Sequence, residues 1–505
     1  MQTSERMQGL IFGGMVSQYK GTEPSIRRSS GAHKIASFLR EHNYDIEVID
    51  YIHGWSFEQL QLLVDDRVTK DTLFFGFSST FPIATPELLK LVDYLKEHYP
   101  DIPTVAGSQN ISMKELNCEW QIFGYGEYAI LELLRHFQGG PEPVNVNKTI
   151  DAYHNYQAYP KADLTVRYEE RDNITEREVL LLEFSRGCKF KCGFCSFPVL
   201  GVKEDHTRSA DNLYDELLEN YDKWGTESYI VLDETFNDTS EKIEKYANVM
   251  KRLPFEPKLT GYIRADLIAS RKKDWDNLIS MGFCSHFYGI ESFNNSSART
   301  IGKGMNTGRL QDGLLEVKEY FTEQAGYYKG HLSLIAGLPY ETIDSLRETK
   351  RWIDNYWQGN PFQMTVLMIK DLNIFAPDLS HFSKLDKSWK EYGYKQVPFD
   401  PENKGIDTGD YPWYQQLYDL YKTGMYLSWD NGNMTTYEAL KWLTEEFPHT
   451  QYIDPFAVDN YYIDPEVTWK DIAIKSFMEI GPRRKELIEQ HIEKYKQKKL
   501  IQLDN

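Results

Sequence analysis

Short apolar runs alternate with amphipathic stretches through the first 137 residues of the chain. The apolar runs predict strands at residues 10–15, 46–51, 73–79 and 103–108. The stretches between them have helical spacing, at residues 31–42, from Ser56 onward and at 86–98. Residues 121–137 add a strand, a glycine turn and a helix. This alternation is typical of a doubly wound parallel sheet.

The alternation resumes at residue 179 and continues to about residue 375. Strands are predicted at residues 179–184 and 229–232 and within 258–268, 286–292, 331–339 and 365–375. One helix is predicted at residues 211–224, and another begins at Asp238, because Glu241 follows at the spacing of a capping box. Repeated strand–helix units of this kind predict a partial (β/α)6 barrel, in which chemistry gathers at the carboxyl ends of the strands.

These patterns divide an α/β chain into four parts. We expect a Rossmann-like domain at residues 1–140, a linker rich in Pro, Asn, Asp and Tyr at 141–178, the barrel at 179–384, and a mostly helical domain at 385–505. The last part is crowded with aromatic residues such as Trp389, Trp429 and Trp442. Two interpretations of these side chains stay open: they form the core of the C-terminal domain, or they offer a surface that selects the substrate.

Composition limits the partners and the location of the protein. The 505 residues include 57 Lys and Arg against 76 Asp and Glu, for a net charge of −19, and no basic block stands out. Nucleic acid is therefore not an expected partner. No apolar run approaches the ~20 residues of a membrane span, and the N-terminus shows no apolar signal segment. We expect a cytoplasmic protein without a membrane span.

The stretch 183–200, EFSRGCKFKCGFCSFPVL, carries the clearest chemistry in the sequence. Cys188, Cys192 and Cys195 can converge from one short loop on a metal centre, and soft thiolates favour zinc, copper(I) or an iron–sulfur cluster. Three cysteines on a four-iron cluster leave one iron open to bind a further ligand. The alternative is a zinc site completed by Cys118, Cys284 or His206.

This loop resembles the CxxxCxxC cluster loop of the radical S-adenosylmethionine (SAM) superfamily, and Gly187 and Phe194 also match that family. The resemblance implies an enzyme in which Cys188, Cys192 and Cys195 hold a 4Fe-4S cluster. The open iron then binds SAM, which is reduced to a 5'-deoxyadenosyl radical that abstracts hydrogen from a small-molecule or peptide substrate. It further implies an electron-donating partner, a reductase such as flavodoxin or ferredoxin.

Two further segments, 289–304 and 336–342, resemble the regions around the fourth and fifth strands of that family. By this resemblance the SAM site comprises Phe194, Asp233, Glu234, Arg264, Glu291, Ile335 and Gly337. Each carboxylate has an alternative interpretation as a salt-bridge partner or a helix cap. Lys303, in the first segment, is interpreted as a surface residue.

The N-terminal domain resembles the cobalamin-binding domain that precedes many radical SAM barrels. Small residues follow its strands, and the sequence GYGE at residues 124–127 stands where that family often has GEGE. The implied cobalamin site comprises Ser78, Ser79, Gly107, Ser108, Gly124, Gly126 and Glu127. The DxHxxG motif of other cobalamin proteins is missing, since the loop after the first strand reads GGMVSQYKGTEP.

The combined resemblance predicts cobalamin-dependent methyl transfer to carbon. Two alternatives stay open. The first is a radical SAM cyclase or rearrangement enzyme with a vestigial cobalamin domain. The second is a protein that holds an iron–sulfur cluster or zinc without catalysis.

Overall fold

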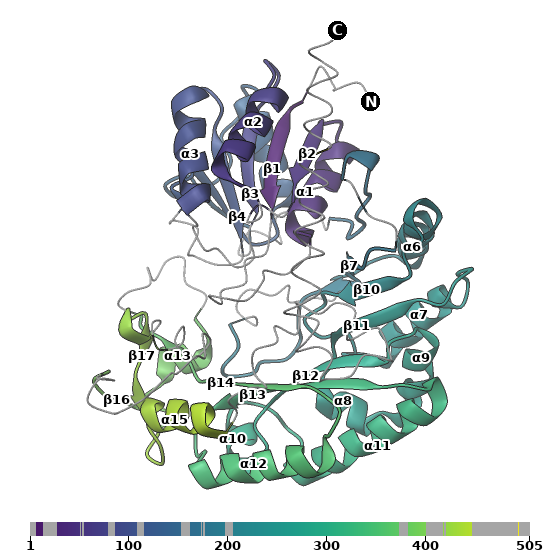
Figure 1. The fold of residues 1–505 in the computed structure, drawn as a ribbon, viewed down its shortest axis with the longest axis vertical. Helices are drawn as coiled ribbons and strands as arrows, with labels where there is room; N and C mark the ends of the chain where they lie inside the picture. Colours follow the sequence, from purple (N-terminus) through teal and green to yellow (C-terminus); the bar gives the residue numbers. More distant parts are fainter. Residues whose placement is uncertain are drawn as a thin grey trace.

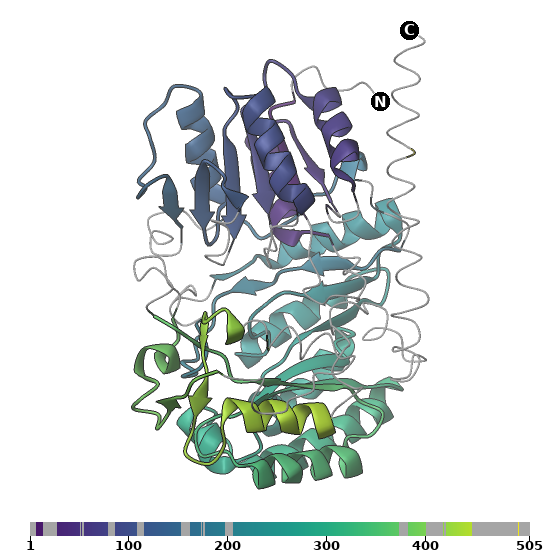
Figure 2. The same ribbon diagram turned by 60° about the vertical axis from the view of Figure 1, so that its left-hand side comes forward.

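Two parallel six-stranded sheets dominate the computed structural model of the chain (Figure 1). The structure describes residues 7–13, 28–50, 52, 55–78, 86–108, 116–152, 162–172, 174, 177–196, 206–372, 382–399, 418, 421–446 and 493. The N-terminal sheet, purple to blue, stands above the second sheet, which is teal to green. In Figure 2 the arrowheads of the N-terminal strands point toward the second sheet, so the carboxyl ends of these strands face it.

The N-terminal sheet has the strand order β2-β1-β3-β4-β5-β6 with every neighbouring pair parallel. Its strands are β1 (Gly9–Gly13), β2 (Ile46–Ile49), β3 (Phe74–Ser78), β4 (Thr104–Ser108), β5 (Trp120–Phe123) and β6 (Thr149–Asp151). Helices α1 (Ser30–Glu41) and α4 (Glu127–Phe137) share one core with the sheet, and α2 (Phe57–Arg67) and α3 (Pro86–His98) share another. The predicted doubly wound sheet is confirmed. Ligands of such sheets bind at the carboxyl edge, near the switch in strand order between β1 and β3.

Helix α2 shows how local sequence sets an element boundary. The Ser56 hydroxyl accepts a hydrogen bond from the Gln59 backbone N–H, and the Gln59 side chain accepts one from the Ser56 N–H. This capping box satisfies two backbone donors that the first turn would otherwise leave open. The helix therefore begins directly after Ser56, as predicted.

The second sheet has the order β14-β13-β12-β11-β10-β7, again with parallel neighbours. Its strands are β7 (Leu180–Leu182), β10 (Ser228–Val231), β11 (Lys258–Tyr262), β12 (Ser285–Glu291), β13 (Lys329–Ala336) and β14 (Phe362–Val366). The sheet is open at β7 and β14, which fits the predicted partial barrel. A short antiparallel pair, β8 (Ser185–Arg186) and β9 (His206–Thr207), comes between β7 and β10 in the chain.

Helices connect the strands of this barrel: α6 (Ala210–Trp224), α7 (Ser240–Met250), α8 (Ala265–Ser270), α9 (Trp275–Ser280), α10 (Asn295–Thr300), α11 (Thr307–Ala325) and α12 (Ile343–Tyr356). Helix α7 begins two residues later than predicted, because Thr239 and not Asp238 is its cap: the Thr239 hydroxyl accepts from the Lys242 N–H at 3.2 Å. Strand β11 ends at Tyr262, so Arg264 lies beyond it, at the cap position of α8.

The segment predicted as a linker, residues 141–178, packs against the N-terminal domain through the part that the structure describes. It contributes β6 to the sheet and a 3-10 turn at Glu170–Asp172. Arg40 of α1 forms two hydrogen bonds to Asp172, at 2.7 and 2.9 Å, and Arg28 forms two to Glu178, at 2.6 and 2.9 Å. A three-residue strand such as β6 is too short to show a hydrophobic period, which explains why the sequence pattern missed it.

The described part of the C-terminal region contains helices and short strands. It comprises α13 (Lys384–Ser388), β16 (Lys395–Gln396), β17 (Tyr426–Leu427), β18 (Trp429–Asp430) and α15 (Thr436–Glu446). Strand β17 pairs with β15 (Ile369–Lys370) and β16 with β18. Trp429 and Trp442 are buried in the same core as the barrel, so their aromatic rings support packing. Among the described helices, none is both long and apolar enough to cross a bilayer.

Candidate functional site

The cysteine loop follows β7 and β8, and hydrogen bonds to residues of the barrel hold it in place. Asp233, which follows β10, accepts hydrogen bonds from the Phe184 N–H at 2.7 Å and the Ser185 hydroxyl at 2.5 Å. Within the loop, the Gly193 N–H donates to the Ile301 carbonyl, and the Gly193 carbonyl accepts from the Leu385 N–H, both at 2.8 Å. The Asp233 carboxylate and the backbone at Ile301 and Leu385 therefore fix the loop.

The three cysteines of the loop are each partly exposed and without disulfides. The Arg264 Nη1 donates to Cys192 Sγ at 3.6 Å, and the Thr235 hydroxyl lies 3.5 Å from Cys188 Sγ. Among the described residues, no three His, Cys, Asp or Glu side chains converge on one metal ion. The thiolates of a four-iron cluster each bind a different iron, and hydrogen bonds to sulfur such as that of Arg264 tune such clusters. The assignment of the three cysteines to a cluster stays a prediction.

Asp233 and Glu234 are neighbours in sequence, but the structure separates their surroundings. Asp233 lies beneath the loop, where both carboxylate oxygens are occupied and Lys242 lies 3.7 Å away. Glu234 instead lines a cavity between the two domains. Burial, together with the nearby Glu183 carboxylate, raises the pKa of Glu234 to about 8. The position of Asp233 favours the alternative of a salt-bridge partner, and the predicted SAM contact of both residues stays a prediction.

Phe194, Glu291 and Lys303 lie together on the barrel side of the loop. Glu291 ends β12 with a φ of 66°, and its carboxylate lies 3.4 Å from the Lys303 ammonium. That ammonium also donates to the Gly289 carbonyl at 2.8 Å and lies 5.8 Å from the centre of the Phe194 ring. Burial raises the pKa of Glu291. Lys303, interpreted from sequence as a surface residue, is only 17% exposed and belongs to this group.

Arg264 lies beside the loop and is held there by two further contacts. Its Nε donates to Asp266 at 2.7 Å, and its guanidinium lies 3.7 Å from the centre of the Phe190 ring. The structure therefore places this side chain against the Cys192 thiol. The predicted contact to the ribose or methionyl end of SAM is not tested by this arrangement.

Gly337 and Ile335 lie at the end of β13, next to a buried carboxylate that sequence reasoning did not single out. Glu341 accepts hydrogen bonds from the Ser292 hydroxyl at 2.6 Å and from the Gly337 N–H at 2.8 Å. Burial raises the pKa of Glu341 to about 7. The signal was the segment AGLPYET itself, in which Glu341 follows the glycine and proline of the turn.

Gly337 allows a close approach of Trp429 to the backbone. Its φ is 98°, and a Cβ built at this position would lie 2.0 Å from a carbon of the Trp429 ring. We expect the Gly337→Ala variant to lose at least about 3 kcal/mol of unfolding free energy, because backbone strain and the clash add together. The control is Gly432→Ala, where φ is 86° and no atom lies within 4 Å, so only strain of about 1 kcal/mol remains. Urea titrations of the two variants measure the difference, and equal losses would contradict the contact.

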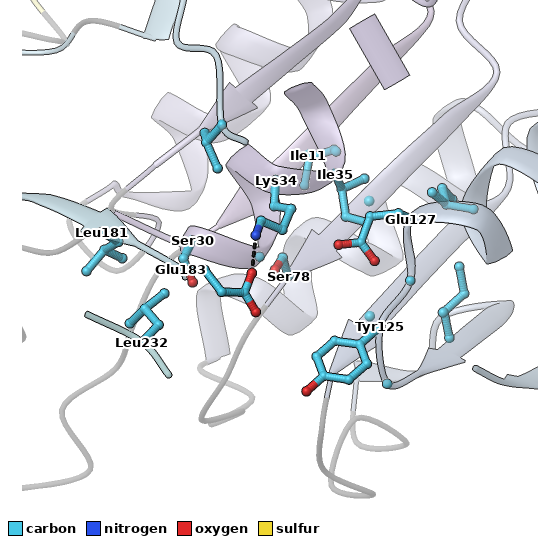
Figure 3. A pocket seen from close by; sticks show the side chains of 18 of the residues that line it. Ile11, Ser30, Lys34, Ile35, Ser78, Tyr125, Glu127, Leu181, Glu183 and Leu232 are labelled. Carbon is cyan, nitrogen blue, oxygen red and sulfur yellow. Dashed lines mark hydrogen bonds and ion pairs between the residues drawn. The ribbon is translucent and has the colours of Figure 1, made fainter. Parts of the chain in front are cut away.

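A cavity of about 210 Å³ lies between the N-terminal domain and the start of the barrel (Figure 3). Apolar side chains line part of it, among them Ile11, Phe74, Val105, Ile122, Ile130 and Leu181. The predicted cobalamin residues Ser78, Gly107, Gly124, Gly126 and Glu127 all line it. Ser79 and the side chain of Ser108 lie outside what the structure describes. The structure thus brings together five of the seven residues predicted for that site.

Buried charges cross this cavity from one domain to the other. Lys34 of α1 pairs with Glu183, as Figure 3 shows, and Glu183 accepts from Arg186 at 2.8 Å. Arg186 donates in turn to Glu127, at the start of α4, at 2.5 Å. Burial alone would raise the pKa of Glu183, but the charges of Arg186 and Lys34 hold it at about 2. Glu183 and Arg186 flank the loop in sequence, which was the available signal for this network.

The cavity fits part of a large polar ligand. A Cβ at Gly107 would meet nothing within 4 Å, so that space is open. The Arg186 Nη1 is buried and has no hydrogen-bond partner among the described residues. Among the described residues that line the cavity there is no histidine. A corrin is larger than this cavity, so the lining residues would hold one portion of cobalamin through amide or phosphate oxygens and apolar contact.

Comparison with known proteins gives three findings. Residues 182–353 match the family model described as the radical SAM superfamily. A protein of Methanocaldococcus jannaschii, provisionally named a methylthiotransferase, is 23% identical over 350 residues, which are 64% of this chain and 71% of that protein. The chain also resembles solved structures in its fold.

The radical SAM methyltransferase TsrM of Kitasatospora setae, with tryptophan substrate and a SAM analogue bound, is similar across 97% of this chain and 100% of its own, with a TM-score of 0.65 and 12% identity. The cobalamin-dependent radical SAM enzyme OxsB, with aqua-cobalamin and SAM bound, covers 77% of this chain and 56% of its own, with a TM-score of 0.55 and 15% identity. At such identities the likeness concerns the fold: a parallel N-terminal sheet joined to a parallel barrel sheet.

Proposed function

We propose that this chain, which belongs to the radical SAM superfamily, is a cobalamin-dependent enzyme. In this proposal the enzyme transfers a methyl group to a carbon atom of an organic substrate. One observation carries the proposal. The cavity at the carboxyl edge of the N-terminal sheet is shared with Glu183, Arg186 and Glu234, which border the cysteine loop. A ligand in that cavity would lie beside a cluster in the loop, as sequential use of two cofactors requires.

The cysteine loop supports the first half of this function. Cys188, Cys192 and Cys195 would hold the 4Fe-4S cluster, with Arg264 donating a hydrogen bond to the Cys192 sulfur. Such a bond stabilises the thiolate and makes a cluster easier to reduce. Glu291 and Lys303 form a charged pair next to Phe194, which suits a ligand with an ammonium, a carboxylate and an apolar face. SAM has all three features.

The N-terminal cavity supports the second half. When bound, the cluster supplies the electron that cleaves SAM, and cobalamin supplies the methyl group. Gly107 and Ser78 leave room at the ends of β4 and β3, while Lys34 and Arg186 offer donors to amide or phosphate oxygens. A cofactor bound against the apolar walls would displace water, which protects reactive species from side reactions.

The remaining partners follow from this chemistry. A radical SAM enzyme needs a reductant, for which we propose a flavodoxin or ferredoxin with its reductase. The substrate is proposed to be a small molecule or a peptide. The net charge of −19 argues against a nucleic acid.

An anaerobic assay tests the proposal. Protein reconstituted with iron and sulfide is mixed with hydroxocobalamin, desalted, reduced with dithionite and given SAM. We expect the desalted protein to keep a corrinoid absorbance, and SAM to be converted to 5'-deoxyadenosine and S-adenosylhomocysteine. Cleavage of SAM without corrinoid retention would contradict methyl transfer and favour a cyclase or rearrangement enzyme. Absence of any SAM cleavage would contradict radical chemistry altogether.

A further inference from the structure

Arg186 lies between the cavity and the cysteine loop and contacts both domains. It belongs to β8, two residues before Cys188, and its side chain is only 3% exposed. The guanidinium donates to Glu127 at 2.5 Å and to Glu183 at 2.8 Å, and it lies 4.2 Å from the centre of the Tyr125 ring. Tyr125 and Glu127 come from the N-terminal domain. Arg186 is therefore a direct link from that domain to the loop that carries the thiolates.

The hydrogen bonds of this guanidinium leave one of its nitrogens, Nη1, without an acceptor among the described residues. Nη1 is buried and donates to no group in the part of the chain that the structure describes, and Arg186 lines the cavity. A buried donor without an acceptor costs about 1–3 kcal/mol. Nε and Nη2 are already satisfied by carboxylates, so they hold the planar group in one orientation. An oxygen atom of a ligand in the cavity would remove the cost by accepting from Nη1.

The backbone around Arg186 has little freedom, so a change at its side chain reaches the loop. On one side, Asp233 binds the Phe184 N–H and the Ser185 hydroxyl. On the other, the Gly187 N–H donates to Glu234 at 3.2 Å, and Gly187 has a φ of 99°. Glu234 also lines the cavity. Arg186 and Glu234, which both line the cavity, therefore lie at the stretch of backbone that leads into Cys188.

We propose that Arg186 is a positioning residue that couples the two cofactor sites: a cobalamin oxygen that accepts from Nη1 fixes the start of the cysteine loop, so that cobalamin and cluster stabilise each other. This inference rests on the proposed function. Coupling of this kind is reciprocal and typically changes affinity 5–150-fold. Cobalamin therefore slows the loss of iron, and the cluster tightens the binding of cobalamin.

The test measures loss of iron from the full-length, reconstituted protein to a ferrous chelator, under anaerobic conditions, with and without saturating hydroxocobalamin. We expect hydroxocobalamin to slow iron release by at least about fivefold in the wild-type protein. The protection ratio is the rate of iron release without hydroxocobalamin divided by the rate with it. The Arg186→Lys variant keeps the charge but loses the planar set of donors of the guanidinium, so its protection ratio is expected to fall toward one. The dissociation constant of hydroxocobalamin, followed by absorbance, should be at least about fivefold higher in cluster-free wild-type protein than in the reconstituted protein.

Arg171→Lys is the matched control. Arg171 pairs with Asp45 of the N-terminal domain and is not among the residues that line the cavity, so this variant alters a contact to that domain without touching the cavity. Its protection ratio should equal that of the wild-type protein. Equal loss in both variants would overturn the role of Arg186 and assign the effect to domain contact in general.

The wild-type protein alone separates the remaining outcomes, even if the Arg186→Lys variant does not fold. Failure to retain hydroxocobalamin would overturn the proposed function. Retention of hydroxocobalamin with an unchanged rate of iron release would overturn the coupling and leave the proposed function standing.

Discussion

Alanine in place of Cys188, Cys192 or Cys195 is expected to leave the reconstituted protein without a stable iron–sulfur cluster and to lower SAM cleavage by more than about a hundredfold. Removing a residue that only hydrogen-bonds to a metal ligand already costs 10–100-fold in metal affinity or activity. Removing the ligand itself also removes a bond to iron, so we expect a larger loss. The measurements are iron and sulfide content, the electron paramagnetic resonance spectrum of the reduced protein, and 5'-deoxyadenosine formed from SAM.

Cys118→Ala and Cys284→Ala are the controls for this experiment. Both residues are buried outside the loop, and burial raises the pKa of each thiol to about 12. They are therefore protonated and poor metal ligands at neutral pH. Both variants should keep their iron. Iron loss in either control, or full iron content in any of the three loop variants, would contradict the assignment; one zinc per chain and no iron would favour the zinc alternative.

Phenylalanine in place of Gly107 is expected to block the cavity and to abolish retention of a corrinoid. Gly107 lies on β4 with Val105 on the same face, and both line the cavity. Because a Cβ there meets no atom within 4 Å, the ring enters empty space and the strand is not displaced. A ligand forced against an added side chain loses about 1–3 kcal/mol or more, which is at least about fivefold in affinity.

The Gly107→Ala variant provides the comparison, since a methyl group fits the same space with room to spare. It should retain hydroxocobalamin after desalting as the wild-type protein does. Iron content should be the same in all three proteins, because Gly107 is remote from the cysteines in the chain. Wild-type retention by the Gly107→Phe variant would place the corrinoid elsewhere.

Periodicity and capping were enough to predict the architecture. Alternating apolar runs predicted both parallel sheets, and Ser56 marked the start of α2. Predictions were weaker where an element is short or where contacts are distant in sequence. Strand β6 has only three residues, and the Arg186–Glu127 pair joins residues 59 positions apart. No local pattern reveals such a pair.

The candidate site was predictable to a similar degree. The close spacing of three cysteines was enough to single out the loop, but the different surroundings of Asp233 and Glu234 could not be predicted. Successive residues of an extended chain point in opposite directions, and here one carboxylate supports the loop while the other faces the cavity. Position in the sequence does not give direction in space, and the SAM contact of both residues stays a prediction. Lys303 was interpreted as exposed for the same reason, since its partner Glu291 lies 12 positions earlier, across a turn and a helix.

The packed connection between the two sheets bears on how this protein can be divided. Arg28 and Arg40 are buried in the N-terminal domain, yet their partners Glu178 and Asp172 belong to the segment that leads into the barrel. In a fragment that ends before residue 162, Arg28 would keep its ion pair with Asp50, but Arg40 would lose both Asp172 and Glu169. Breaking a buried ion pair costs several kcal/mol. The N-terminal sheet is therefore expected to need the residues up to Glu178 to stay fully stable when it is separated from the barrel.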